Sequence, residues 1–191
     1  MTATKDQIYI QKVLLGDISS YSCLVDNYKD MVFTLALKIV RNREDAEEVA
    51  QDSFVKAFQK LQTFKGESKF STWLYTIVYR TAITKIRKKI VETTDVNEYV
   101  IDNHSIGFSI SQLDLLKSEE QKKYVKMAID VLPELDALLI TLFYINENTF
   151  DEIIEITGLT MANVKVRLFR ARKKIYNELS KVLKEELNTI I

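Results

Sequence analysis

Hydrophobic residues recur at intervals of three and four along most of this chain, which is the period of an amphipathic α-helix. The alternation typical of β-strands is weak, and the Asn-Gly and Asp-Gly pairs that favour tight hairpins do not occur. Four glycines and one proline in 191 residues leave few points at which a helix must break. The pattern therefore predicts an all-α fold, organised as two small helical domains joined by a linker.

Three helices are predicted in the first domain, over residues 1–91. The apolar spacing indicates a helix from about Ile18 to Val40 and a second one that Asn42 can cap at its start. A loop around Gly66 separates the second helix from a third, whose apolar residues begin near Trp73. Three such helices can enclose one small core.

The helical period fails after Val91 and returns near residue 119. Residues 92–118 are rich in Asp, Asn, Ser and Thr, which predicts an acidic linker longer than compact domains usually contain. A simple tether and a specific role for this linker fit the sequence equally well. Residues 119–191 then predict a second domain of four helices, the second of which starts at Pro133.

The last two helices of the second domain have the spacing of a helix-turn-helix. Phe150 to Thr157 form a short amphipathic helix, Gly158 supplies the left-handed conformation that ends it, and Thr160 can cap the next helix. An amphipathic helix, a three-residue turn with glycine and a basic helix are together typical of this DNA-binding motif.

The helix from Thr160 to Ile175, which continues through Leu179 and toward Leu187, has two opposed faces. The stretch to Ile175 carries six positive charges and no acidic residue. Its apolar stripe is Val164, Leu168, Ala171 and Ile175, and the opposite face is Ala162, Lys165, Phe169 and Lys173. A solvated charged face is the simplest interpretation. Phe169 favours nucleic acid instead, because an aromatic residue opposite the core is useful against a thymine methyl or a sugar.

Two surfaces of the first domain also indicate partners. Glu48, Gln51 and Asp52 follow one edge of the second helix at intervals of three and four, which suits a basic protein surface. The loop and the third helix mix aromatic residues with six basic residues, and no acidic one occurs between Ser68 and Val91. Rings set among cations are typical of sites that stack unpaired bases, although Trp73 is expected to pack in the core.

The net charge of zero hides segregated blocks along the chain. Residues 1–91 carry 15 basic and 10 acidic groups, residues 92–120 carry 1 and 7, and residues 121–191 carry 11 and 10. A chain of zero net charge can therefore still present basic surfaces to a polyanion.

The composition excludes several classes of protein. Cys23 is the only cysteine and His104 the only histidine, so a disulfide, a metal site or histidine catalysis has almost nothing to build on. We expect no metal, no cofactor and no catalytic residue. No apolar run approaches the ~20 residues of a membrane span, and the N-terminus lacks a signal segment, so we expect a cytoplasmic protein without membrane insertion.

Four motifs occur along the chain: D-A-E-E-V-A-Q-D-S-F, F-K-G-E-S-K-F-S-T-W-L, L-P-E-L-D-A-L-L and T-M-A-N-V-K-V-R-L-F-R-A-R-K-K. In this order and spacing they resemble regions two and four of extracytoplasmic-function (ECF, group IV) RNA polymerase sigma factors of the sigma-70 family. The resemblance spans about Ser20 to Leu179. It implies a non-enzymatic sigma factor that binds core RNA polymerase, through its clamp helices and flap, and directs promoter-specific transcription initiation.

The resemblance also implies a role for each part of the chain. Residues 1–91 would bind polymerase and recognise and melt the minus-ten element, and residues 119–191 would recognise the minus-thirty-five element. The acidic linker between them would pass toward the polymerase active centre. Sequestration by an anti-sigma factor is common in the family, although no residue here demonstrates it.

Three sets of residues carry these roles by position. The residues implied to contact the clamp helices are Glu48, Gln51 and Asp52. Those implied at the minus-ten element are Phe64, Lys65, Gly66, Glu67, Ser68, Lys69, Phe70, Trp73 and Arg80. Those implied at the minus-thirty-five element are Lys165, Val166, Phe169 and Arg170 on bases, and Arg167 and Lys173 on phosphates.

Two positions depart from the family pattern. Many members have Asn where Arg80 stands, at a position that helps to form the pocket for an extruded base. Ile154 lies in the helix-turn-helix where a small residue usually permits close crossing of the two helices.

Two other functions compete with the sigma-factor hypothesis. The first is a helix-turn-helix regulator that binds an operator without polymerase, while the first domain senses a signal or dimerises. That alternative accounts for residues 150–175 but leaves the aromatic and basic loop unused. The second, a small nucleic-acid enzyme, lacks any paired carboxylate, metal cluster or nucleophile constellation.

Overall fold

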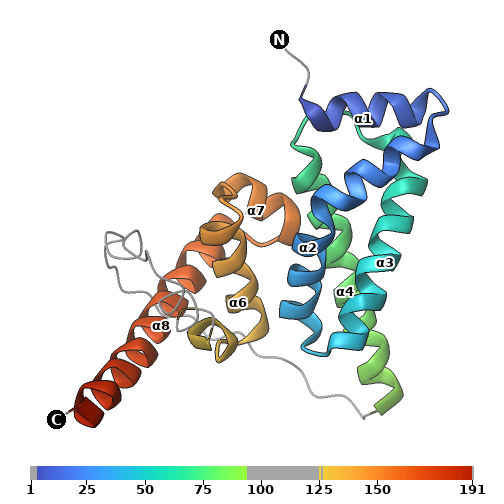
Figure 1. Ribbon diagram of the computed structural model, residues 1–191. Helices are drawn as coiled ribbons and strands as arrows, with labels where there is room; N and C mark the ends of the chain where they lie inside the picture. The colour runs from blue at the N-terminus through green and yellow to red at the C-terminus, as the bar shows by residue number, and fades with distance from the viewer. Residues whose placement is uncertain (1–3, 94–124, 126, 191) are drawn as a thin grey trace.

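The structure is a computed structural model that describes residues 4–93, 125 and 127–190. Every regular element in these ranges is helical, which confirms the predicted all-α class. Figure 1 shows a bundle formed by the N-terminal helices, a smaller group of helices beside it, and a long last helix that extends away from the bundle. No helix in the described part of the chain is long and apolar enough to cross a bilayer.

The N-terminal module contains four α-helices and two short 3₁₀ turns. They are α1 (Lys5–Leu14), η1 (Ile18–Ser20), α2 (Tyr21–Val40), α3 (Arg43–Lys60), η2 (Leu61–Thr63) and α4 (Phe70–Thr93). The three predicted helices correspond to α2, α3 and α4, which pack against one another. Leu35 of α2, Val49 of α3 and Val78 of α4 lie on the predicted apolar stripes and are buried, whereas Phe58, on the predicted stripe of α3, is 38% exposed.

Helix α1 is an element that the sequence analysis missed. Its apolar side is short, with Ile10 and Val13 as its buried residues. The helix begins with a capping box, because the Thr4 side chain accepts from the Gln7 backbone N–H at 3.3 Å and Gln7 bonds back to Thr4. That local signal, rather than the apolar period, identifies the helix.

The C-terminal module contains the predicted helix-turn-helix. Its described elements are α6 (Glu134–Ile140), the π-helical turn η3 (Thr141–Ile145), α7 (Phe150–Thr157) and α8 (Met161–Ile190), and residues 127–130 are also helical. Pro133 is the N-cap of α6 rather than its first residue. Gly158 ends α7 at φ 72°, in the left-handed region that glycine adopts without strain.

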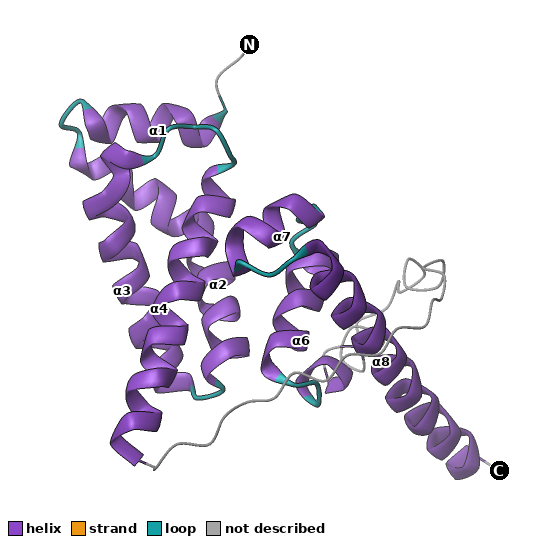
Figure 2. Cartoon of the chain, turned by 180° about the vertical axis from the view of Figure 1, so that it is seen from behind, coloured by secondary structure: helices purple, strands orange, loops and turns teal. Residues whose placement is uncertain are grey.

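The two modules pack against each other. Helix α4 contacts α7, and α2 contacts α6, so buried residues of both modules form one continuous hydrophobic cluster. Figure 2 shows α7 between the N-terminal bundle and α8. Helix α4 runs to Thr93, and the rest of the predicted linker 92–118, with His104, lies outside the described residues.

Candidate nucleic-acid interface

The first half of α8 is oriented by its apolar stripe. Val164, Leu168, Ala171 and Ile175 are at most 3% exposed, as their spacing predicts. The Thr160 hydroxyl accepts from the Asn163 backbone N–H at 3.3 Å, so Thr160 caps the helix as predicted. The side of α8 that the sequence analysis assigned to a polyanion therefore faces away from the core.

That outer side carries the residues predicted to contact the minus-thirty-five element. Lys165 and Lys173 are exposed, while Val166, Phe169 and Arg170 are partly buried. The Lys165 ammonium lies 5.6 Å from the centre of the Phe150 ring, a cation–π distance that links α8 to the first helix of the motif. The structure brings these five residues together on one helix.

Arg167 and Arg172, in the first half of α8, have partners inside the protein. The Arg167 guanidinium donates to the Asp136 carboxylate on α6 at 2.9 Å, and both side chains are largely buried. Arg172 donates to the Tyr144 hydroxyl at 2.9 Å. The structure therefore places Arg167 beside a carboxylate, apart from the outer residues with which the sequence analysis grouped it.

The aromatic residues before and within α4 form a cluster. Phe70 is 4% exposed and lies 5.7 Å, between ring centres, from both Phe64 and Trp73. Tyr28 of α2 approaches Phe70 edge-on at 5.5 Å. Such ring pairs stabilise packing beyond their buried area. Trp73 packs against the core as predicted, and Phe70, a predicted DNA contact, is a core residue.

The loop from Phe64 to Lys69 lies on this aromatic cluster. Gly66 has φ 75°, so a side chain there would be strained even though the space around its Cα is open. Lys65, Gly66 and Glu67 are exposed, and on α4 the predicted base-pocket residue Arg80 is exposed as well. The loop thus presents polar groups outward over an apolar base.

The end of this loop contacts α7 of the other module. Lys69 forms an ion pair with Glu152 at 3.0 Å, and Ser68 donates to Glu155 at 3.1 Å. Burial disfavours the charged form of Glu152, but the Thr149 backbone N–H and the Lys69 ammonium outweigh it, so the pKa of this carboxyl is lowered. Carboxylates of the helix-turn-helix therefore bind two of the residues predicted to contact the minus-ten element, Ser68 and Lys69.

The acidic edge of α3 is exposed, as predicted. Glu48, Gln51 and Asp52 are all exposed on this helix. The Lys85 ammonium of α4 pairs with Glu48 at 2.6 Å and with Asp45 at 3.5 Å. This pairing with Lys85 orients Glu48, the first residue of the acidic edge. The spacing of residues along α3 did not predict the pairing.

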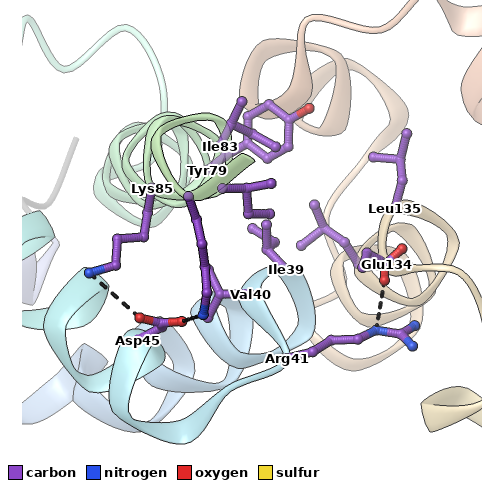
Figure 3. Close-up of a pocket in the computed structure, with 12 residues that line it drawn as sticks. Ile39, Val40, Arg41, Asp45, Tyr79, Ile83, Lys85, Glu134 and Leu135 are labelled. Carbon is purple, nitrogen blue, oxygen red and sulfur yellow. Dashed lines mark hydrogen bonds and ion pairs between the residues drawn. The ribbon is translucent and has the colours of Figure 1, made fainter. Parts of the chain in front are cut away.

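A pocket of about 530 Å³ lies at the seam between the modules. Its apolar lining comes from α2, α4 and α6, with Ile39, Ile83 and Leu135 among the residues that Figure 3 labels. Ion pairs stand at its rim: Lys85 with Asp45 on one side, and Arg41 with Glu134 at 3.2 Å on the other (Figure 3). Of these pairs only Arg41 with Glu134 joins the two modules, and both of its side chains are exposed, so it contributes little to the contact.

Family comparisons match both modules. Residues 24–90 match the family model for sigma-70 region 2, and residues 122–175 match the one for sigma-70 region 4. The chain is 31% identical over 185 residues to the ECF RNA polymerase sigma-E factor of Salmonella typhimurium, which covers 94% of this chain and 96% of that protein. It is 30% identical over 176 residues to the ECF RNA polymerase sigma factor SigW of Bacillus subtilis, with 89% and 94% covered.

Solved structures share the fold. The sigma factor RpoE of Bartonella quintana, solved with the anti-sigma factor NepR, superposes with a TM-score of 0.62 at 20% identity, over 84% of this chain and 96% of that one. CnrH, solved with the cytosolic domain of CnrY, superposes with a TM-score of 0.60 at 20% identity, over 91% and 96%. The arrangement of helices is therefore one found in other sigma factors.

Proposed function

The chain belongs to the extracytoplasmic-function sigma factors of the sigma-70 family, and we propose here which of its residues do that family's work. It binds core RNA polymerase and directs promoter-specific transcription initiation. The match of both regions in one chain carries this conclusion, because an operator-binding regulator has no use for region two. In this proposal polymerase supplies the catalysis, and the chain acts with it in the cytoplasm.

The polymerase contact is proposed on the acidic edge of α3, where Glu48, Gln51 and Asp52 would meet the clamp helices. Three observations support it: the residues are exposed, they share one edge, and their charge suits a basic partner. The flap is proposed as the contact of the C-terminal module.

The minus-ten contact is proposed on the loop 64–69 with Arg80. Lys65, Gly66 and Glu67 form the exposed part, and Ser68 and Lys69 join them once α7 has moved away. Phe64, Phe70 and Trp73 act mainly as the packed base that holds the loop in shape. Unpaired bases then stack at the edge of this cluster rather than on each ring in turn.

The minus-thirty-five contact is proposed on the outer face of α8. Lys165, Val166, Phe169 and Arg170 would enter the major groove, and Lys173 would contact a phosphate. Arg167 is assigned no DNA contact, because its guanidinium is bound to Asp136.

Promoter binding by this chain requires the modules to separate. In the structure the modules are packed together, an arrangement we call closed. In this closed arrangement the α7 carboxylates of Glu152 and Glu155 bind Lys69 and Ser68 of the loop. The Lys69 side chain is 65% exposed and the Arg41 side chain is 43% exposed, so these two ion pairs contribute little to holding the modules together. Separation also exposes the apolar contacts of α4 with α7 and of α2 with α6, and binding to polymerase has to offset that loss. Polymerase would hold the modules apart, and an anti-sigma factor, such as the NepR solved with RpoE, would hold the chain away from polymerase.

Transcription in vitro tests the function. Purified chain is added to core polymerase and a library of promoter fragments, and permanganate then detects unpaired thymines. A sigma factor produces a specific open complex with reactive thymines near the start site. A chain that binds duplex DNA without opening it would instead be the operator-binding regulator.

The polymerase contact has its own test. Asp52→Arg reverses the charge of an exposed residue, so it should abolish binding to core polymerase while the fold persists. Asp26→Arg, an equal charge change on the exposed side of α2, is the matched control and should bind normally. Wild-type binding by the Asp52 variant would refute the clamp assignment.

A further inference from the structure

The surroundings of Arg167 on α8 do not resemble those of a DNA contact. Its side chain is 21% exposed, and the Asp136 side chain that it binds is 9% exposed. The Arg167 Nε atom is buried and has no hydrogen-bond partner in the described part of the protein. Moving this guanidinium from Asp136 to a phosphate would leave a buried carboxylate unpaired, which is strongly unfavourable.

The pair joins the supporting helix of the module to the DNA-binding helix. Asp136 lies in the first turn of α6, and Arg167 lies between the buried residues Val164 and Leu168 on α8. Both partners belong to the C-terminal module, so separation of the two modules does not pull them apart.

The position of Arg167 determines where its neighbours point. At about 100° per residue, side chains two positions before and after Arg167 point roughly 160° away from it. Those positions are Lys165 and Phe169, the exposed and partly buried residues of the outer face. Binding Arg167 to α6 thus turns Lys165 and Phe169 away from α6 and toward solvent.

We propose that Arg167 is a positioning residue, anchored by Asp136, that sets the rotation of α8 so that Lys165 and Phe169 face the promoter. This rests on the proposed role of α8 at the minus-thirty-five element. The competing role is a phosphate contact, in which Asp136 merely competes with DNA for the guanidinium. The two roles predict opposite effects when the Asp136 charge is removed.

Asp136→Asn is the decisive variant, tested in holoenzyme on a promoter and on a copy with its minus-thirty-five element scrambled. If Arg167 positions α8, the preference for the intact promoter falls on the order of tenfold, as for a displaced base contact. If Arg167 binds phosphate, removing its competitor strengthens binding to both promoters and steepens the salt dependence by about one charge. The second result would overturn the proposal.

A double variant covers the case in which Asp136→Asn does not fold. Asp136→Leu with Arg167→Met replaces the ion pair by an apolar pair of similar volume, which buried sites tolerate. A positioning role predicts a preserved promoter preference and an unchanged salt slope. A slope lower by about one, as expected for the control Lys173→Ala, would instead identify a lost phosphate contact and refute the proposal.

Three controls complete the design. Asp151→Asn removes an exposed acid from α7 and should leave the promoter preference unchanged. Thermal unfolding of each variant separates a loss of position from a loss of fold. If wild-type holoenzyme does not distinguish the two promoters, the proposed role of α8 is refuted. If wild-type holoenzyme does distinguish them and Asp136→Asn leaves that preference intact or increases it, only the positioning role of Arg167 is refuted.

Discussion

The start of α4 with the loop before it, and the outer face of α8, contain similar residues in different surroundings. Each combines phenylalanine with lysine, yet Phe70 is 4% exposed inside an aromatic cluster and Phe169 lies partly exposed on a helix surface. Lys69 is paired with Glu152 of the other module, whereas Lys165 lies over the Phe150 ring of its own motif. Phe70 and Lys69 therefore pack in the core and pair with the other module, whereas Phe169 and Lys165 remain on a surface that DNA can reach.

The largest expected difference between the two regions concerns stability. Phe70→Ala removes a buried ring from the cluster with Phe64 and Trp73 and should lower the free energy of unfolding by about 3–5 kcal/mol. Phe169→Ala should lower it by much less, because its ring is only partly buried. Urea unfolding followed by circular dichroism measures both free energies of unfolding. Equal losses in the two variants would show that Phe70 is not a core residue in contrast to Phe169.

The next difference concerns promoter binding through α8. Lys165→Ala should weaken minus-thirty-five-dependent binding of holoenzyme by about 1–3 kcal/mol if Lys165 contacts a base. Lys174→Ala is the matched control, because nine positions along a helix turn it to the opposite side from Lys165. A fluorescence-anisotropy titration on duplex promoter compares the two. An effect of similar size for both lysines would indicate general electrostatic attraction instead.

A smaller effect is expected where α7 covers the loop. Glu155→Lys places a cation beside Lys69 and removes the acceptor of Ser68, so the closed contact should open at lower salt. Trp73, the only tryptophan, lies against Phe64 and reports on this region without a label. Acrylamide quenching of the free chain against salt concentration measures the shift. Asp151→Lys, the same charge change on the same helix, should shift it less.

The smallest effect is a dependence of the closed contact on pH. The folded-state pKa of Glu152 is lowered from the ordinary value of 4.5, so its contribution is present above that value and is lost as pH falls through the lower folded pKa. Quenching of Trp73 should therefore increase below about pH 4.5. The Glu152→Gln variant should lack this step. A step of unchanged size in that variant would assign the titration to another carboxyl.

The parts of the fold that could be predicted are those with local causes. The caps at Asn42, Gly158 and Thr160 each depend on residues within a few positions, and all three are confirmed. The apolar stripe of α8 is confirmed for the same reason. Helix α1 was missed because its apolar period is short, although the Thr4 and Gln7 capping box marks it.

The candidate sites could be predicted only in part. The spacing of Glu48, Gln51 and Asp52 correctly predicted an exposed edge. It could not separate Phe70, which packs in the core, from the exposed residues of the loop before it, because periodicity is undefined where a helix begins. Which residues contact polymerase and DNA stays a prediction that the variants above can test.

The sequence by itself determined the helices α2, α3 and α4, the helix-turn-helix and the family, because periodicity, caps and ordered motifs are properties of neighbouring residues. Only the tertiary structure decided which cations face outward. Arg167 is bound by an acid 31 positions away, and Ser68 by one 87 positions away. These partners meet because α6 packs on α8 and α4 packs on α7. The burial of a charge, and therefore its freedom to bind DNA, depends on that packing and not on its place along the chain.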